Sequence, residues 1–251
     1  MNPDPTLDSI GLPYEMIAET IEESWRPYMS RISQVDALDL QRSVSDVYKQ
    51  AGTICWTTEE YKASDHGQAN AHVGLYEVRE HCNPTQGPSW WPDAPHTSAS
   101  RPLGGLKVVD LTRVIAAPAI TRGLAELGAS VMRVTAPHLA DYSSLHCDLN
   151  WGKWNCHLDF RSEDDRAKLR SLISDADVVV SGYRPHVLDR WGFSEEGILE
   201  LCSHRERGII YVRENCYGWY GPWAHRSGWQ QISDAVCARM LNRARLMLIA
   251  N

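Results

Sequence analysis

The sequence lacks several features that would assign it to a well-marked class of protein. Its seven cysteines form an odd total and include no Cys-x-x-Cys pair, so neither a disulfide framework nor a structural zinc site is supported. No apolar run approaches the ~20 residues that a membrane-spanning helix needs. A net charge of −7 offers no basic face of the kind that binds nucleic acid. We therefore predict reduced thiols and no contact with membranes or nucleic acid.

The common signatures of cofactor and nucleophile sites are also missing. No Gly-x-Gly-x-x-Gly follows the first predicted strand, and the second strand ends in Val134-Thr135-Ala136 without the acid that would hold a ribose, which argues against a nicotinamide-dependent enzyme. No Gly-x-Ser-x-Gly elbow is present. The first five residues show neither the basic nor the apolar region of a signal peptide. The expected location is cytoplasmic, with an organelle as the alternative.

Histidines and acids gather in one stretch without the spacing of metal ligands. His138, His146 and His157 surround Asp141 and Asp148, but no pair lies at i and i+4 as in a helical metal motif. We predict no metal site and no permanently bound cofactor.

The most informative stretch runs from residue 106 to residue 134. Val108, Val109 and Leu111 form a short apolar run typical of a buried strand. A helix with Pro118 in its first turn and Gly128 just past its end is predicted next, and a second strand follows. The turn between strand and helix lies at the carboxyl end of the first strand, where open α/β sheets bind ligands.

The regular alternation continues to about residue 237. Further strands are predicted at 155–160, 177–181 and 209–212, separated by helices that Ser162 and Ser194 begin, and a last helix begins near Trp229. This order favours an α/β fold, a Rossmann-like, doubly wound and mostly parallel sheet. Because the sheet lacks closing elements, we expect an incomplete domain, through truncation or mis-splicing.

Residues 1–80 predict a small, mainly helical segment. One helix carries Ile17, Ile21 and Trp25 and is bounded by Pro27, and Ser33 caps a second. Thr57 and Glu60 have capping-box spacing for a third, and a strand is predicted at 72–78.

Residues 81–102 are rich in Pro, Ser and Trp and predict a linker, anchored to a surface by Trp90 and Trp91. The expected domains are thus 1–80, the linker 81–102, and 103–251.

Basic side chains are spread over the predicted strand ends and loops, where they could either hold phosphates together or be solvated surface charges. They are Arg113, Arg133, Lys153, Arg184 and Arg190.

Six segments in order resemble one known family. Residues 101–118, from Arg-Pro-Leu-Gly-Gly-Leu-Lys-Val-Val-Asp to Ala-Ala-Pro, resemble the opening of family III CoA-transferases, the CaiB/BaiF family. Similar to later family segments are 124–134, 150–159, 176–185, 188–193 and the glycine loop 217–226. Residues 51–78 resemble, more weakly, a piece of the family's C-terminal half, which suggests a member incomplete at both ends.

The resemblance implies a Rossmann-like domain, a homodimer, and transfer of CoA between carboxylic acids. An aspartate of the family attacks the acyl-CoA thioester and passes through a mixed anhydride to an aspartyl-CoA thioester. Acyl-CoA and a carboxylic acid are then the substrates. The matching positions for CoA are Arg113, Val114, Ile115, Lys153, Tyr183, Arg190 and Trp191.

The nucleophile position departs from the family's Gly-aromatic-Asp-x-x-x-Gln pattern. Here Gln230 occupies the aspartate position and Asp234 the glutamine position. Glutamine cannot form the anhydride, and Asp234 lies one helical turn further, ~6 Å along the axis. Asp234 is a possible substitute or an ordinary helix residue.

Two other functions remain open from the sequence. The chain could bind CoA or acyl-CoA without transferring it, or it could be related to acyl-CoA racemases and isomerases. Their histidine would precede the aspartate position, where Trp229 stands. A non-functional truncated product is a third possibility.

Overall fold

The computed structural model describes residues 4–95, 97–139 and 141–237. Contacts divide the chain into two compact units. One is Val78–Asn215, and the other holds the residues before Val78 together with those from Cys216 onward. Compactness alone does not define a domain, and the domain boundaries expected from the sequence stay predictions.

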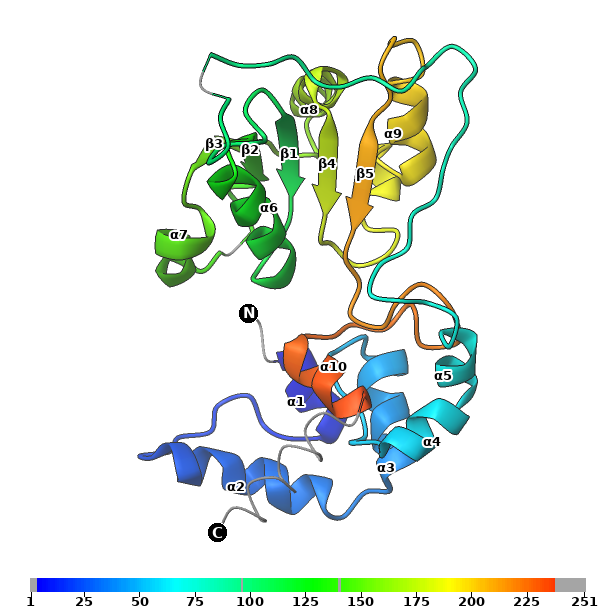
Figure 1. The fold of residues 1–251 in the computed structure, drawn as a ribbon. Coiled ribbons are helices and arrows are strands. Elements are labelled where there is room, and N and C mark those ends of the chain that lie inside the picture. Colours follow the sequence, from blue (N-terminus) through cyan, green and yellow to red (C-terminus); the bar gives the residue numbers. More distant parts are fainter. Residues whose placement is uncertain (1–3, 96, 140, 238–251) are drawn as a thin grey trace. The chain divides into compact units, whose positions relative to one another are not determined.

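The Val78–Asn215 unit is built on a parallel sheet of five strands (Figure 1). The strands lie in the order β3-β2-β1-β4-β5, and all four neighbouring pairs are parallel. This matches the first five strands of the Rossmann order, so the predicted fold class is confirmed. The strands are β1 (Lys107–Leu111), β2 (Ser130–Thr135), β3 (Lys153–His157), β4 (Val178–Ser181) and β5 (Ile210–Arg213).

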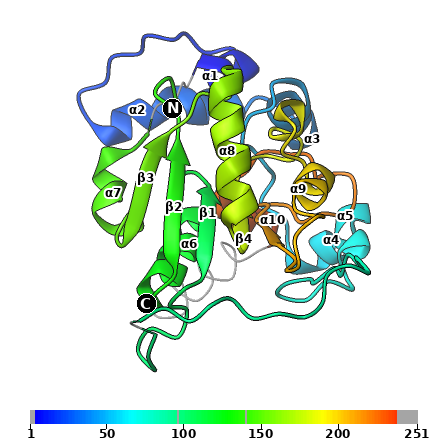
Figure 2. The ribbon, with the colours of Figure 1, turned by 90° about the horizontal axis from the view of Figure 1, so that it is seen from above.

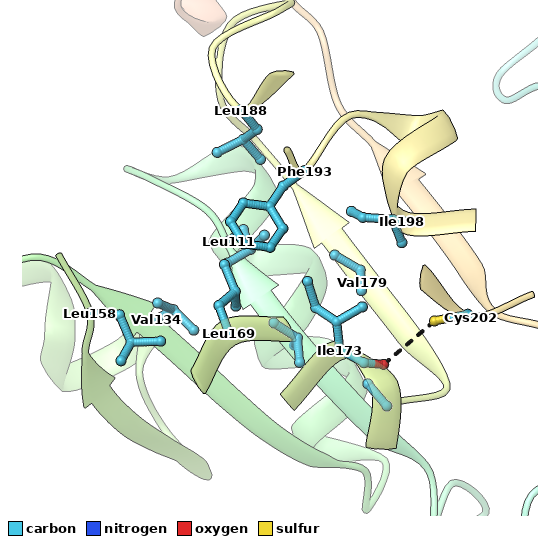
Figure 3. Close-up of a cluster of buried hydrophobic side chains, with 12 residues drawn as sticks. Leu111, Val134, Leu158, Leu169, Ile173, Val179, Leu188, Phe193, Ile198 and Cys202 are labelled. Carbon is cyan, nitrogen blue, oxygen red and sulfur yellow. Dashed lines mark hydrogen bonds between the residues drawn. The ribbon is translucent and has the colours of Figure 1, made fainter. Parts of the chain in front are cut away.

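Helices cover both faces of this sheet, as a doubly wound fold requires. Figure 2 shows α8 lying along the sheet. On its face the alternate strand residues Val109 and Leu111 pack with Leu169, Ile173 and their neighbours (Figure 3). On the other face Val108 and Val131 pack with Leu124 of α6. The helices are α6 (Ala116–Glu126), α7 (Ser143–Leu149), α8 (Glu163–Asp175), α9 (Glu195–Leu201) and the 3-10 turn η2 (Asp189–Trp191).

Most of the helix ends, caps and strand starts predicted for this unit agree with the structure. Gly128 has φ +105° after α6, and Ser194 accepts a hydrogen bond from the Gly197 N–H at the start of α9. β3 begins at Lys153, two residues before the predicted start at 155. Trp91 anchors the linker, because its Nε1 donates to the Gly104 carbonyl at 3.2 Å.

The other unit is helical, and several predicted boundaries there were wrong. α2 continues through Pro27 instead of ending before it. Ser33 closes α2, and Asp36 caps α3 through the N–H groups of Leu38 and Asp39. The capping box of Thr57 and Glu60 is confirmed. The helices are α1 (Asp4–Ile10), α2 (Ile21–Ile32), α3 (Ala37–Gln41), the π-helix η1 (Arg42–Val47), α4 (Thr58–Ala63), α5 (Asp65–Ala69) and α10 (Gln230–Val236).

The strand predicted at residues 72–78 does not form. No strand lies beside this segment in the described part of the chain, and Leu75 is 100% exposed. An isolated strand leaves its backbone groups unpaired and buries no face, so the local sequence alone was insufficient.

Candidate functional site

The order of the strands reverses between β1 and β4, and open α/β sheets bind ligands in the crevice outside the carboxyl ends of the strands at such a point. Thr112, Arg113, Val114 and Ile115 connect the end of β1 to α6. Gly182 leads out of β4, followed by Tyr183 and Arg184. The structure thus brings the predicted residues 113–115 and Tyr183 to one edge of the sheet.

Gly182 allows the end of β4 to approach the start of α6. A Cβ at this position would lie 2.4 Å from the Cβ of Ala117, which is itself buried. The connection from β1 to α6 and the connection that leaves β4 can therefore pack closely.

A Gly182→Ala substitution should therefore destabilise the protein by about 1–3 kcal/mol, the usual cost of overpacking. Adding Ala117→Gly should recover part of that loss, because it removes the atom that clashes. Gly123→Ala in α6, with no atom within 4 Å of its new Cβ, is the matched control and should not destabilise. Urea unfolding measures all four proteins; a Gly182→Ala variant as stable as the parent would contradict the steric account.

Tyr183 lies among charged groups at this edge. Burial raises the pKa of its phenol, against the opposing influence of Arg113 and Arg133. Arg133 is buried and forms an ion pair with Asp141. Burial is the largest single influence on the pKa of Asp141 and acts to raise it, but the hydrogen bonds from Arg133 and the Tyr142 N–H, together with the charges of Arg133 and His146, lower the pKa overall. Arg133 is therefore already paired inside the protein and does not act as a solvated surface charge.

Lys153 lies in a buried polar network rather than at the surface. Its side chain and that of Asp110 are both 0% exposed, and Nζ lies 2.9 Å from Asp110 Oδ2. The amine also donates to the Pro118 carbonyl at 2.9 Å and to Thr121 Oγ1 at 2.7 Å. Burial lowers the pKa of Lys153, and Asp110 opposes that shift. All three N–H donors of the amine are thus used within the protein.

Arg190 and Trp191 lie together on η2. The Arg190 guanidinium carbon lies 5.1 Å from the centroid of the Trp191 ring, a cation–π distance. Trp191 also packs against the core on the α8 face. Arg190 is exposed, so its charge remains available to an anion in solution.

The glycine loop 217–226 belongs to the helical unit and is fixed there by hydrogen bonds to side chains of that unit. Arg226 forms a two-point ion pair with Asp46, at 2.8 Å for each bond. Burial would raise the pKa of the Asp46 carboxyl, but the Arg226 hydrogen bond is the larger influence and lowers it. Asn70 donates to the Tyr220 carbonyl at 2.9 Å. Residues from the two ends of the sequence therefore shape one loop.

His66 is the buried centre of these contacts. Its Nδ1 accepts from the Trp223 N–H at 3.2 Å, so its proton is on Nε2, 2.9 Å from the Tyr217 carbonyl. The ring stacks on Trp223 with centroids 4.8 Å apart. Burial lowers the pKa of His66 below 6.5, and Arg226 adds to the shift.

Acid should therefore weaken this unit. Because the folded-state pKa of His66 lies below that of the unfolded chain, its contribution is complete above pH ~6.5 and decreases as the pH falls towards the folded value. Urea unfolding at pH 7.5 and 5.5 should show this loss in the parent and a smaller loss in His66→Gln. The variant His204→Gln, which changes an exposed histidine, should lose as much unfolding free energy between pH 7.5 and pH 5.5 as the parent. An equal loss in the parent and in both variants would contradict the prediction.

Gln230, which the sequence predicts at the family's nucleophile position, is the first residue of α10. Gln230 Nε2 donates to Asp234 Oδ1 at 3.0 Å. One helical turn separates their backbones, but the side chains close most of that gap. The Asp234 carboxylate thus lies beside Gln230, the residue that the sequence predicts at the family's aspartate position.

Comparison with known proteins decides the family. The model of CoA-transferase family III matches residues 103–243. This chain belongs to CoA-transferase family III. Acetyl-coenzyme A transferase nodX of Hypoxylon pulicicidum is 58% identical over 94% of this chain and 40% of its own length. An acyl-CoA transferase of Gibberella moniliformis is 39% identical over 87% of this chain and 37% of its own.

A crystal structure of a CAIB/BAIF family protein from Brucella suis aligns with 53% of this chain and 38% of that chain, at 30% identity and a TM-score of 0.48. This CoA-transferase family III chain spans about two fifths of the length of the curated relatives named above. No helix in the described ranges is long and apolar enough to cross a membrane. Nor do three or more His, Cys, Asp or Glu side chains form a metal-binding group there.

Sequence reasoning missed the buried groups that support this site. Asp110 was detectable, because an acid inside the apolar run Val108–Leu111 needs a buried partner. Its partner Lys153 lies 43 residues away, and no local pattern connects the two. His66 and Asp46 gave no signal, since their partners are more than 150 residues distant.

Proposed function

We propose that this chain supplies CoA-binding and nucleophilic groups of a CoA-transferase that moves CoA between carboxylic acids. The observation that carries the proposal is the 3.0 Å hydrogen bond between Gln230 and Asp234 in a family member. It keeps a carboxylate beside the family's nucleophile position, although the sequence has a glutamine there. The names of the relatives, an acetyl-CoA and an acyl-CoA transferase, agree with this reaction class.

In the proposed reaction, a carboxylate oxygen of Asp234 attacks the acyl-CoA carbonyl and the C–S bond breaks, releasing CoA thiolate. The thiolate attacks the aspartyl carbonyl of the mixed anhydride and releases the donor acid. The acceptor carboxylate attacks the resulting aspartyl-CoA thioester, breaks its C–S bond and forms a second anhydride with release of the CoA thiolate. The thiolate then attacks the acceptor's acyl carbon, which gives the new acyl-CoA and frees the Asp234 carboxylate. A carboxylate suits these steps because it is both a nucleophile and a tolerable leaving group.

For CoA we propose the edge of the sheet at β1 and β4. The backbone at Arg113, Val114 and Ile115, with Tyr183 above the crevice, would face the nucleotide. Arg190 and Trp191 would supply a cation and a ring to its phosphates and adenine. Lys153 lies at the amino end of β3, and its three internal hydrogen bonds favour an indirect role, that of holding α6 to the sheet. A homodimer and a cytoplasmic location stay predictions.

Arg190→Ala should weaken CoA binding about tenfold, because one exposed charge-assisted contact to a phosphate is removed. Calorimetric titration with CoA measures the effect. Arg170→Ala is a matched control, since Arg170 is an arginine of α8 paired with Glu163. Equal CoA affinity in the Arg190→Ala variant and the parent would remove Arg190 from the site.

A CoA-binding protein without transfer is the second candidate, favoured by Gln230 itself. Calorimetry with CoA and an acyl-CoA, followed by mass spectrometry for a covalent adduct, separates the two. An adduct on Asp234 supports the transferase. Binding without an adduct supports the second candidate, and a folded protein that releases no heat contradicts both.

A further inference from the structure

A hollow of about 710 Å³ lies in the Val78–Asn215 unit, away from the carboxyl ends of the strands. Its walls come from the end of α6, the turn into β2 and the start of β3. Glu126, Ser130 and Gly152 mark these three elements. The volume is within the ~300–1,000 Å³ of small-molecule sites. The hollow is at the amino ends of β2 and β3, so it is separate from the crevice proposed for CoA.

Two exposed indole rings border this hollow. Trp151 and Trp154 are 71% and 67% exposed. Neither ring stacks on another ring or on a cation among the residues that the structure describes. Each therefore leaves a large apolar face in water, which a flat aromatic ligand would cover favourably.

The two arginines of the hollow differ in their acidic partners. Arg122 pairs with Glu126 and Asp148, at 3.2 Å each. Arg101, the other arginine of the wall, has no acidic partner within 4–95, 97–139 and 141–237. A carboxylate or phosphate would complete its guanidinium fork.

The backbone that carries Arg101 is held against the turn before β2. A Cβ on Gly128 would lie 2.9 Å from the Cβ of Arg101, so only glycine permits this approach. Arg101 also exchanges backbone hydrogen bonds with Ser98. The guanidinium thus extends from a fixed point on the wall.

From these walls we infer a binding site for a small flat aromatic anion, with the ring against Trp151 and Trp154 and the anionic group on Arg101. The aromatic ring of such a ligand would pack against the two indole rings, and its negative charge would pair with the guanidinium. An aliphatic acid would make only the ion pair, and an aromatic amine would make only the ring contact.

Calorimetry with 2-naphthoate, on the full 251-residue chain, tests the site. We expect saturable binding with a Kd below about 1 mM. Binding should weaken at least about tenfold in Arg101→Gln and in Trp154→Leu. It should stay within about twofold of the parent in the control Trp90→Leu, which changes another tryptophan that is 72% exposed.

Two probes and one competitor sharpen the test. 2-Naphthylmethylammonium, with the opposite charge, and cyclohexanecarboxylate, without the aromatic ring, should both bind much more weakly. Saturating CoA should leave the 2-naphthoate affinity unchanged. Absence of saturable binding, parental affinity in the two wall variants, equal binding of the ammonium, or competition by CoA would each overturn the inference. The first three leave the proposed transferase function untouched, which distinguishes the two failures.

Discussion

Asp234→Asn should abolish the covalent adduct and lower kcat for CoA transfer by at least about a thousandfold, the scale of loss when a nucleophile is removed. CoA affinity should remain within about twofold of the parent, because the amide keeps the size of the side chain. The expected cause is chemical: an amide cannot attack the thioester to form an anhydride. Quenched assays of CoA transfer measure kcat, and mass spectrometry of the quenched protein measures the covalent adduct.

Two further variants of α10 make this result interpretable. Gln231→Asn changes an exposed amide of the same helix and should keep parental activity. The exchanged pair Gln230→Asp with Asp234→Gln returns the family's order, and we expect it to form the adduct at residue 230. Full activity of Asp234→Asn would show that Asp234 is not the nucleophile. An adduct in the exchanged pair alone would show that the parent binds CoA without transferring it.

Lys153→Met should be the most destabilising single substitution proposed here, at about 3–5 kcal/mol. It leaves Asp110 buried and charged without its ionic partner, and an uncompensated buried charge is costly. Burial lowers the pKa of Lys153 while Asp110 opposes the shift, so the pair is interdependent. Urea unfolding measures the loss.

Lys107→Met is a close control for this variant. Lys107 begins β1 as Lys153 begins β3, but its ion pair with Asp175 is exposed, with side chains 53% and 72% accessible. Its loss should cost no more than ~1 kcal/mol. If Lys153→Met instead weakened CoA binding without a change in unfolding free energy, Lys153 would be a direct ligand and not a support.

The comparison of these two lysines shows where sequence reasoning reached its limit. The sequence marked only Lys153, first as a basic residue among the predicted strand ends and loops and then through the resemblance to the family. Whether a lysine at the start of a strand is solvated or buried depends on what lies across the sheet. Here it is decided by Asp110 and Thr121, more than 30 residues away.

The sequence by itself determined the alternation of strands and helices from residue 106, the parallel sheet, and the family. These follow from local periods, caps and turns, and from six ordered motifs, all of which act within a few residues. It also predicted that Gln230 occupies the nucleophile position. The strand predicted at 72–78 does not form, because a strand is stable only beside another strand.

Only the tertiary structure decided which polar groups are buried together. It paired Lys153 with Asp110 and fixed the glycine loop through His66 and Arg226. These contacts join residues far apart in the chain. Their energies depend on burial and on distances that no spacing in the sequence encodes.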